Sequence, residues 1–98
     1  MATLYITECK RAGESFAGFG CHASAIVTEQ SINIDDTSAT SKPFGASTVF
    51  ILVEADFPCC LAFGKDPKAD PTKHRIAADR PRIYGVMPGD RIAVIAAQ

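Results

Sequence analysis

The sequence predicts an all-β protein, an antiparallel β-sandwich of jelly-roll-like form or a small barrel. Short runs rich in Val, Ile and Phe recur along the chain, for example at 48–55 and 91–97, and Gly and Pro residues separate them. Such runs are typical of strands. No segment has the length and periodicity of a helix. The runs amount to about seven or eight short strands with frequent turn signals, the pattern of a sandwich or barrel.

The first strand is predicted at residues 3–8, where Leu4 and Ile6 would share one face of the sheet. Residues 9–20 are expected to form a loop, because three glycines lie there. Phe16 and Phe19 lie between these glycines and would pin the loop to the surface or to a partner.

Two further strands are predicted at 24–30 and 32–35, and a long polar connection at 36–47. The connection is rich in Ser and Thr and contains Pro43 and Gly45. A dozen residues without regular structure is long for a small domain. We therefore expect this connection to be functional, mobile or held by a neighbour.

Residues 49–55 give the strongest strand prediction. With Val49, Ile51 and Val53 towards the core, Phe50 and Leu52 would lie on the opposite face. A solvated sheet face would be polar at those positions, so a second layer or another chain should cover them. Phe50 and Leu52, with Phe16 and Phe19, are therefore the predicted protein-interface residues.

The second half of the chain predicts short strands at 59–63, 83–86 and 92–97. Cys59, Leu61 and Phe63 would share one face of the first of these. Residues 64–74 read as a charged loop, and 75–79 either continue it or form a short strand. Pro88–Gly89 suits the centre of a tight turn. In the last strand, 92, 94 and 96 would face one side and 93, 95 and 97 the other.

Length and charge indicate one domain, residues 1–98, with no nucleic-acid or membrane partner. The chain has 98 residues, 47% of them hydrophobic, which is sufficient for a core. Ten basic and eleven acidic residues give a net charge of −1, and this balance gives no electrostatic reason to expect nucleic acid as the main partner. No basic region followed by an apolar run opens the chain, and no apolar run approaches the roughly 20 residues of a membrane span. We expect a soluble protein made in the cytoplasm.

The four cysteines allow three disulfide pairings, and free thiols are the default without a secretion signal. A zinc site from Cys21, His22, Cys59 and His74 is conceivable, but Cys59 and Cys60 are adjacent and would point to opposite faces. A Cys–His nucleophile would need an activating neighbour and an oxyanion site, and the sequence indicates neither. Buried, unreactive thiols are the expected state. We predict no catalytic residue, metal ligand or cofactor.

Several pieces of the chain together resemble one family. They are LYITE at 4–8, FGKDPKA at 63–69, RIAA at 75–78 and YGVMPGDRIAVI at 84–95. They are similar to short structural proteins of tailed bacteriophages, whereas residues 9–20 depart from that pattern. The resemblance implies a β-sandwich virion component, a head decoration or cement protein, and carries over no catalytic or ligand residue.

The expected function is therefore that of a non-enzymatic virion protein, made in the host cytoplasm and located on the capsid surface. It would bind and stabilise the lattice of the major capsid protein as a homo-oligomer, with a trimer as the first expectation. A head–tail connector or a tail- or fibre-associated component is the alternative within the virion. A small ligand- or carbohydrate-binding sandwich is the alternative outside it, although the chain has no Trp and only two Tyr.

Overall fold

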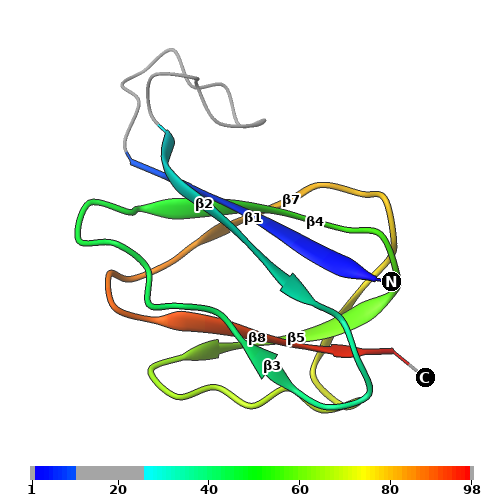
Figure 1. Ribbon diagram of the computed structural model, residues 1–98. Helices are drawn as coiled ribbons and strands as arrows, with labels where there is room; N and C mark the ends of the chain where they lie inside the picture. Colours follow the sequence, from blue (N-terminus) through cyan, green and yellow to red (C-terminus); the bar gives the residue numbers. More distant parts are fainter. Residues whose placement is uncertain (1, 11–25, 98) are drawn as a thin grey trace.

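The structure is a sandwich of two four-stranded antiparallel sheets, which confirms the predicted fold class (Figure 1). It is a computed structural model and describes residues 2–10 and 26–97. The strands in these residues are β1 (Thr3–Cys9), β2 (Ile26–Asn33), β3 (Ala39–Thr40), β4 (Phe50–Ala55), β5 (Cys59–Gly64), β6 (His74–Ile76), β7 (Arg82–Gly85) and β8 (Arg91–Ala96).

The strand order is that of a jelly roll in which the last strand precedes the first. The first sheet runs β2-β1-β4-β7 and the second β3-β8-β5-β6. If β2 to β8 are counted as the first seven strands and β1 as the eighth, the sheets follow the order of a jelly roll, 1-8-3-6 and 2-7-4-5. The chain is therefore a circular permutation of that topology, with its break between β8 and β1.

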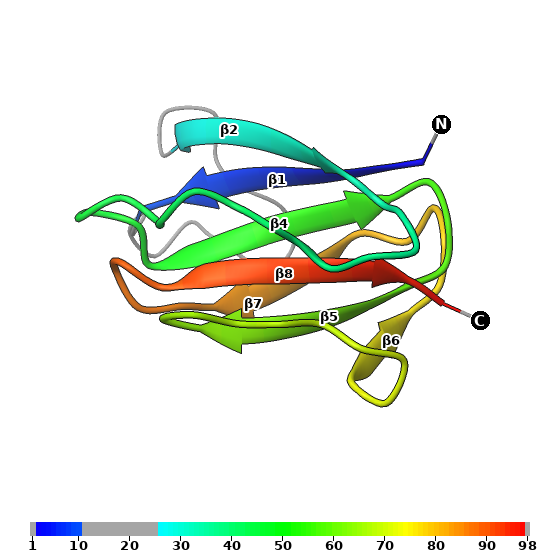
Figure 2. The same ribbon diagram turned by 60° about the horizontal axis from the view of Figure 1, so that its bottom comes forward.

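Both ends of the chain meet the same segment, as the permutation requires. Ala2 O accepts a hydrogen bond from Ile34 N at 3.0 Å, and Asp35 O accepts one from Ala96 N at 2.8 Å. Since Ile34 and Asp35 are consecutive, β1 begins close to where β8 ends. Figure 2 shows both chain ends leaving at the same end of the sandwich.

The core lies between the sheets and follows the period-two alternation of their strands. In the first sheet, Ile6 of β1 pairs with Val53 of β4, and both side chains are at most 1% exposed. The second sheet supplies the fully buried Ile92 and Val94 of β8. The other core members are Leu4, Ile34, Phe44, Ile51, Ala55, Cys59, Leu61 and Ile76. The predicted division of 92–97 into two faces is confirmed.

The outer face of the second sheet is also apolar, and the chain covers it itself. Cys60 of β5 and Ala93 and Ile95 of β8 form a second buried cluster with Ala69, from the β5–β6 connection. Ala69 N donates to Ser38 Oγ at 2.9 Å, which draws this connection across the sheet towards β3.

Four predictions need correction. Val49 precedes β4 and is 44% exposed, so the core face of this segment begins at the fully buried Ile51. The two strands predicted at 24–30 and 32–35 are one strand, β2. The connection at 36–47 contains the short strand β3, which pairs with β8. Cys9 is disulfide-bonded, which corrects the expectation that the thiols are free. Cys59 and Cys60 are free. Of the predicted loop at 9–20, residues 11–20 lie outside the described residues.

Candidate interaction surface

The residues considered for metal binding or nucleophilic chemistry have structural roles where they are described. Cys59 lies in the core, and burial raises the pKa of its thiol to about 11, with a contribution from the charge of Cys60. His74 Nε2 lies 2.8 Å from Tyr84 Oη in a hydrogen bond. No group of three or more His, Cys, Asp or Glu that could hold a metal ion occurs among residues 2–10 and 26–97. Cys21 and His22 lie outside these ranges.

Glu8 is a buried carboxylate, 1% exposed on the inner face of β1. Its Oε1 accepts hydrogen bonds from Gly45 N at 2.9 Å and from Thr48 Oγ1 at 2.7 Å, and its Oε2 accepts one from Gln30 Nε2 at 2.9 Å. Gln30 Oε1 in turn accepts from Lys42 N at 3.1 Å. These contacts satisfy the charge and fix the end of the 36–47 connection against the sandwich. Glu8 is thus an anchor within the fold.

An exposed apolar cluster lies at one end of the sandwich, and we call it the Met87 patch: Val49, Phe63, Val86 and Met87. Val49 is 44% exposed, Phe63 39% and Met87 66%. Together with Gly85 and Asp90 they line an open pocket of about 260 Å³. Three of the five large apolar side chains exposed in the described residues are therefore gathered in one place. Such gathering is typical of an interaction site, whereas singly scattered apolar residues are ordinary.

Hydrogen bonds anchor the turn that presents Met87. Pro88–Gly89 forms the predicted tight turn, with Asp90 N donating to Met87 O at 3.1 Å and Gly89 at φ 85°. Gly89 N also donates to Phe44 O, and Phe44 N to Asp90 O. Met87 is thus exposed on a held turn.

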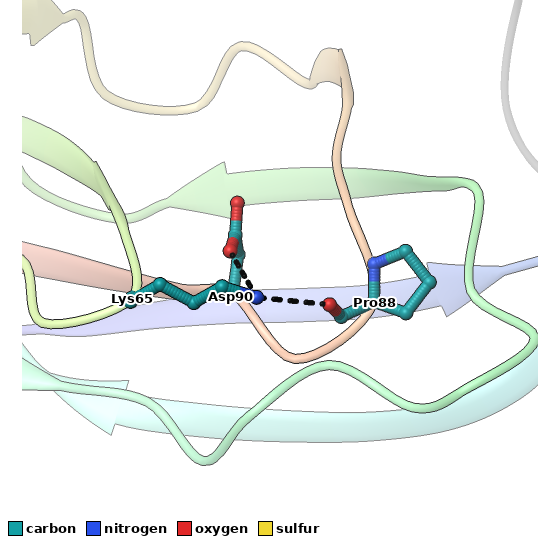
Figure 3. A network of polar contacts seen from close by, with 3 residues as sticks. All are labelled: Lys65, Pro88 and Asp90. Carbon is teal, nitrogen blue, oxygen red and sulfur yellow. Dashed lines mark hydrogen bonds and ion pairs between the residues drawn. The ribbon is translucent and has the colours of Figure 1, made fainter.

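Lys65 holds the same turn from the other side. Its Nζ lies 3.3 Å from Asp90 Oδ1 and 3.5 Å from Pro88 O (Figure 3). The Lys65 side chain is 76% exposed, so the ion pair contributes little to stability. Its contribution is a charged rim beside an apolar patch, the usual anatomy of an interface.

Aromatic side chains connect the patch to β6 and β7. The rings of Phe63 and Tyr84 have centroids 5.1 Å apart, and His74 meets Tyr84 edge-on at 5.7 Å. Burial raises the pKa of Tyr84, so its hydroxyl stays protonated and able to hydrogen-bond His74. The exposed Phe63 is therefore held in place by a packed neighbour.

The predicted interface residues are placed differently from one another. Phe50 and Leu52 do lie on the face of β4 opposite the core, but Phe50 is only 9% exposed in the single chain. Leu52 is half-buried between Thr7 of β1 and Ile83 of β7. Phe16 and Phe19 lie outside the described residues.

The Met87 patch was not predicted from the sequence as an interaction site. Phe63 alternates with Cys59 and Leu61, so its pattern indicates the core, yet it lies near the end of β5 and lines the open pocket. The one available signal was a Met directly before a Pro–Gly turn, an apolar residue at a position that turns usually expose.

Comparison of the chain with family models, with curated proteins and with solved structures finds no match. Within the part of the chain that the structure describes, no helix is long and apolar enough to cross a membrane.

Proposed function

We propose that this protein is a non-enzymatic virion component of a tailed bacteriophage, a decoration protein that binds the lattice of the major capsid protein. The observation that carries the proposal is the Met87 patch, an apolar surface beside a turn that is hydrogen-bonded to Phe44 and flanked by the Lys65–Asp90 ion pair. A surface that is ordered before binding loses little conformational entropy on association. The resemblance of residues 4–8, 63–69, 75–78 and 84–95 to phage structural proteins supplies the virion context.

Titratable side chains in the described residues support a binding role over a catalytic one. Glu8 is bound by three donors from its own fold, and His74 is bonded to Tyr84. Asp70 accepts hydrogen bonds from Thr72, which lower the pKa of its carboxyl. Groups held in this way stabilise turns and connections.

A decoration protein gains from acting as a homo-oligomer, because the capsid lattice repeats its binding sites. Linking several weak contacts raises the overall affinity without any new contact. We therefore assign the Met87 patch to a protein contact, with a neighbouring copy or with the shell.

The test is co-sedimentation of the purified chain with phage heads that lack it. We expect saturable binding in a fixed ratio to the major capsid protein, and greater resistance of the decorated heads to heat. Binding to isolated tails alone would favour the connector or tail alternative. Absence of binding to either at about 10 micromolar chain, a concentration at which even weak interfaces are partly occupied, would overturn the proposal.

A further inference from the structure

Strand β7 lies at the edge of the first sheet, and among residues 2–10 and 26–97 nothing pairs with the outer side of its backbone. Val86 N donates to Val49 O at 3.1 Å, so at this residue the backbone faces β4. Backbone groups alternate in direction along an antiparallel strand, so those of Tyr84 and Arg82 also face β4. The N–H and C=O groups of Ile83 and Gly85 therefore point away from the sheet. No other described residue hydrogen-bonds to them.

We infer that β7 pairs with β7 of a second copy, antiparallel about a two-fold axis at Tyr84. In this register Ile83 lies opposite Gly85 of the second copy, so that the outward-pointing groups bond one another. Tyr84 then lies opposite itself as a non-hydrogen-bonded pair, which suits its β4-facing backbone. A two-fold contact of this kind is self-complementary, and it joins the two four-stranded sheets into one.

The side chains beside β7 favour this occupant. Val86 and Met87 follow the strand directly, so the pairing places these two residues of each copy opposite Arg82 and Pro81 of the other. The exposed Arg82 would lie opposite Val86 of the second copy, which lines the same pocket as Asp90. Each Met87 patch thus lies beside the aliphatic stem of an Arg82 side chain, which can cover apolar surface. Pro81 has no N–H to donate and confines the ladder to the length of β7.

The other edge of the same sheet provides a natural control. Ile34 N donates to Ala2 O, so by alternation the backbone groups of Glu29, Ser31 and Asn33 on β2 also point outwards. Their side chains are exposed and polar. This edge offers hydrogen bonds without an apolar patch. Natural proteins use polar or charged side chains on edge strands to prevent pairing with another chain.

This inference rests on the proposed function only in taking the Met87 patch as a protein contact, and its test needs no phage particle. The mass of the chain is measured by light scattering from about 1 to about 100 micromolar, the range in which small interfaces dissociate. We expect the mass to rise towards that of two chains. Ile83→Pro removes an outward N–H but no bond to β4, and should leave a monomer with an unchanged far-UV circular dichroism spectrum. Ser31→Pro, the matched change on β2, should dimerise like the wild type.

A second variant tests the register without depending on proline. In the double variant Arg82→Cys with Val86→Cys, the new thiol at 82 of each copy lies opposite the new thiol at 86 of the other. The spacing of such a pair suits a disulfide. Mild oxidation should give a covalent dimer, whereas Arg82→Cys alone should not. A wild-type monomer at every concentration would overturn the inference, as would cross-linking by the single variant or loss of association in Ser31→Pro but not in Ile83→Pro. Dimerisation without binding to phage heads would leave this inference standing and refute the proposed function.

Discussion

At the scale of single residues, Glu8 shows how a polar side chain in a core position is made acceptable. Burial of a charge is costly unless hydrogen bonds replace its water. Thr48, Gly45 and Gln30 provide these bonds, and the first two come from a connection that follows Glu8 by about forty residues. The hydrogen bonds that offset the desolvation cost of Glu8 therefore also attach that connection to the sandwich.

Glu8→Ala should lower the free energy of unfolding by about 2–3 kcal/mol, because it leaves buried donors unsatisfied. Glu54→Ala is the control, since Glu54 is an exposed carboxylate on the neighbouring strand β4, and it should change stability by no more than about 0.5 kcal/mol. Urea unfolding at neutral pH measures both. Equal effects of the two substitutions would contradict the anchoring role of Glu8.

Cys59 predicts a loss of stability in alkali. Its pKa is raised by burial from 9.0 to about 11, so the folded chain holds the thiol proton more tightly than the unfolded chain. The stabilisation is therefore complete below pH 9 and is lost as the pH rises towards 11. Unfolding free energies at pH 7, 9, 10 and 11 should show this fall in the wild type. Cys59→Ala should show a shallower fall, and a profile as steep as that of the wild type would count against the assignment.

At the scale of the elements, the turn between β7 and β8 depends on one glycine. Gly89 has φ 85°, and a Cβ there would lie 3.4 Å from Lys65 Nζ. Gly89→Ala should cost about 1–2 kcal/mol of unfolding free energy, because the left-handed backbone conformation strains an L residue. Gly85→Ala is the matched change, since a Cβ there meets nothing within 4 Å and φ is not positive. Thermal unfolding should separate the two variants, and similar losses would show that the backbone angle is not the cause.

Strand alternation predicted much of the fold at this scale. Ile92 and Val94 were expected on one face of their strand and Ala93 and Ile95 on the other, and both faces are buried as separate clusters. Alternation succeeds here because the central strands of a sheet meet a neighbour on each side and a layer on each face.

The candidate surface was less predictable, for a physical reason. Phe63 follows the pattern of its strand, but alternation does not say where the opposite sheet ends. Phe50 was expected to be covered by a second layer or by another chain, and in the single chain it is 9% exposed. In both cases exposure depends on contacts between segments far apart in the sequence, which local pattern does not contain.

At the scale of the whole molecule, the permuted strand order makes a direct prediction. Joining Ala97 to Ala2 with a short Gly-Ser linker and opening the chain between residues 11 and 25 would restore the usual jelly-roll order. We expect this permutant to fold, because both ends contact Ile34–Asp35 and permutation is tolerated where termini lie close together. Circular dichroism should remain β-type and thermal unfolding cooperative. An unfolded permutant would show that the termini are not joined at the right place.

We propose that the Met87 patch is the surface through which this protein attaches to others on a phage head. Met87→Glu places a charge at the most exposed apolar residue of the patch, and Phe57→Glu makes the same change at a residue that is 44% exposed outside it. The deciding measurement is co-sedimentation of wild type and both variants with heads lacking the protein. We predict that Met87→Glu binds at least about tenfold more weakly, a loss of about 1.4 kcal/mol, while Phe57→Glu binds like the wild type. Equal binding of all three would contradict the claim.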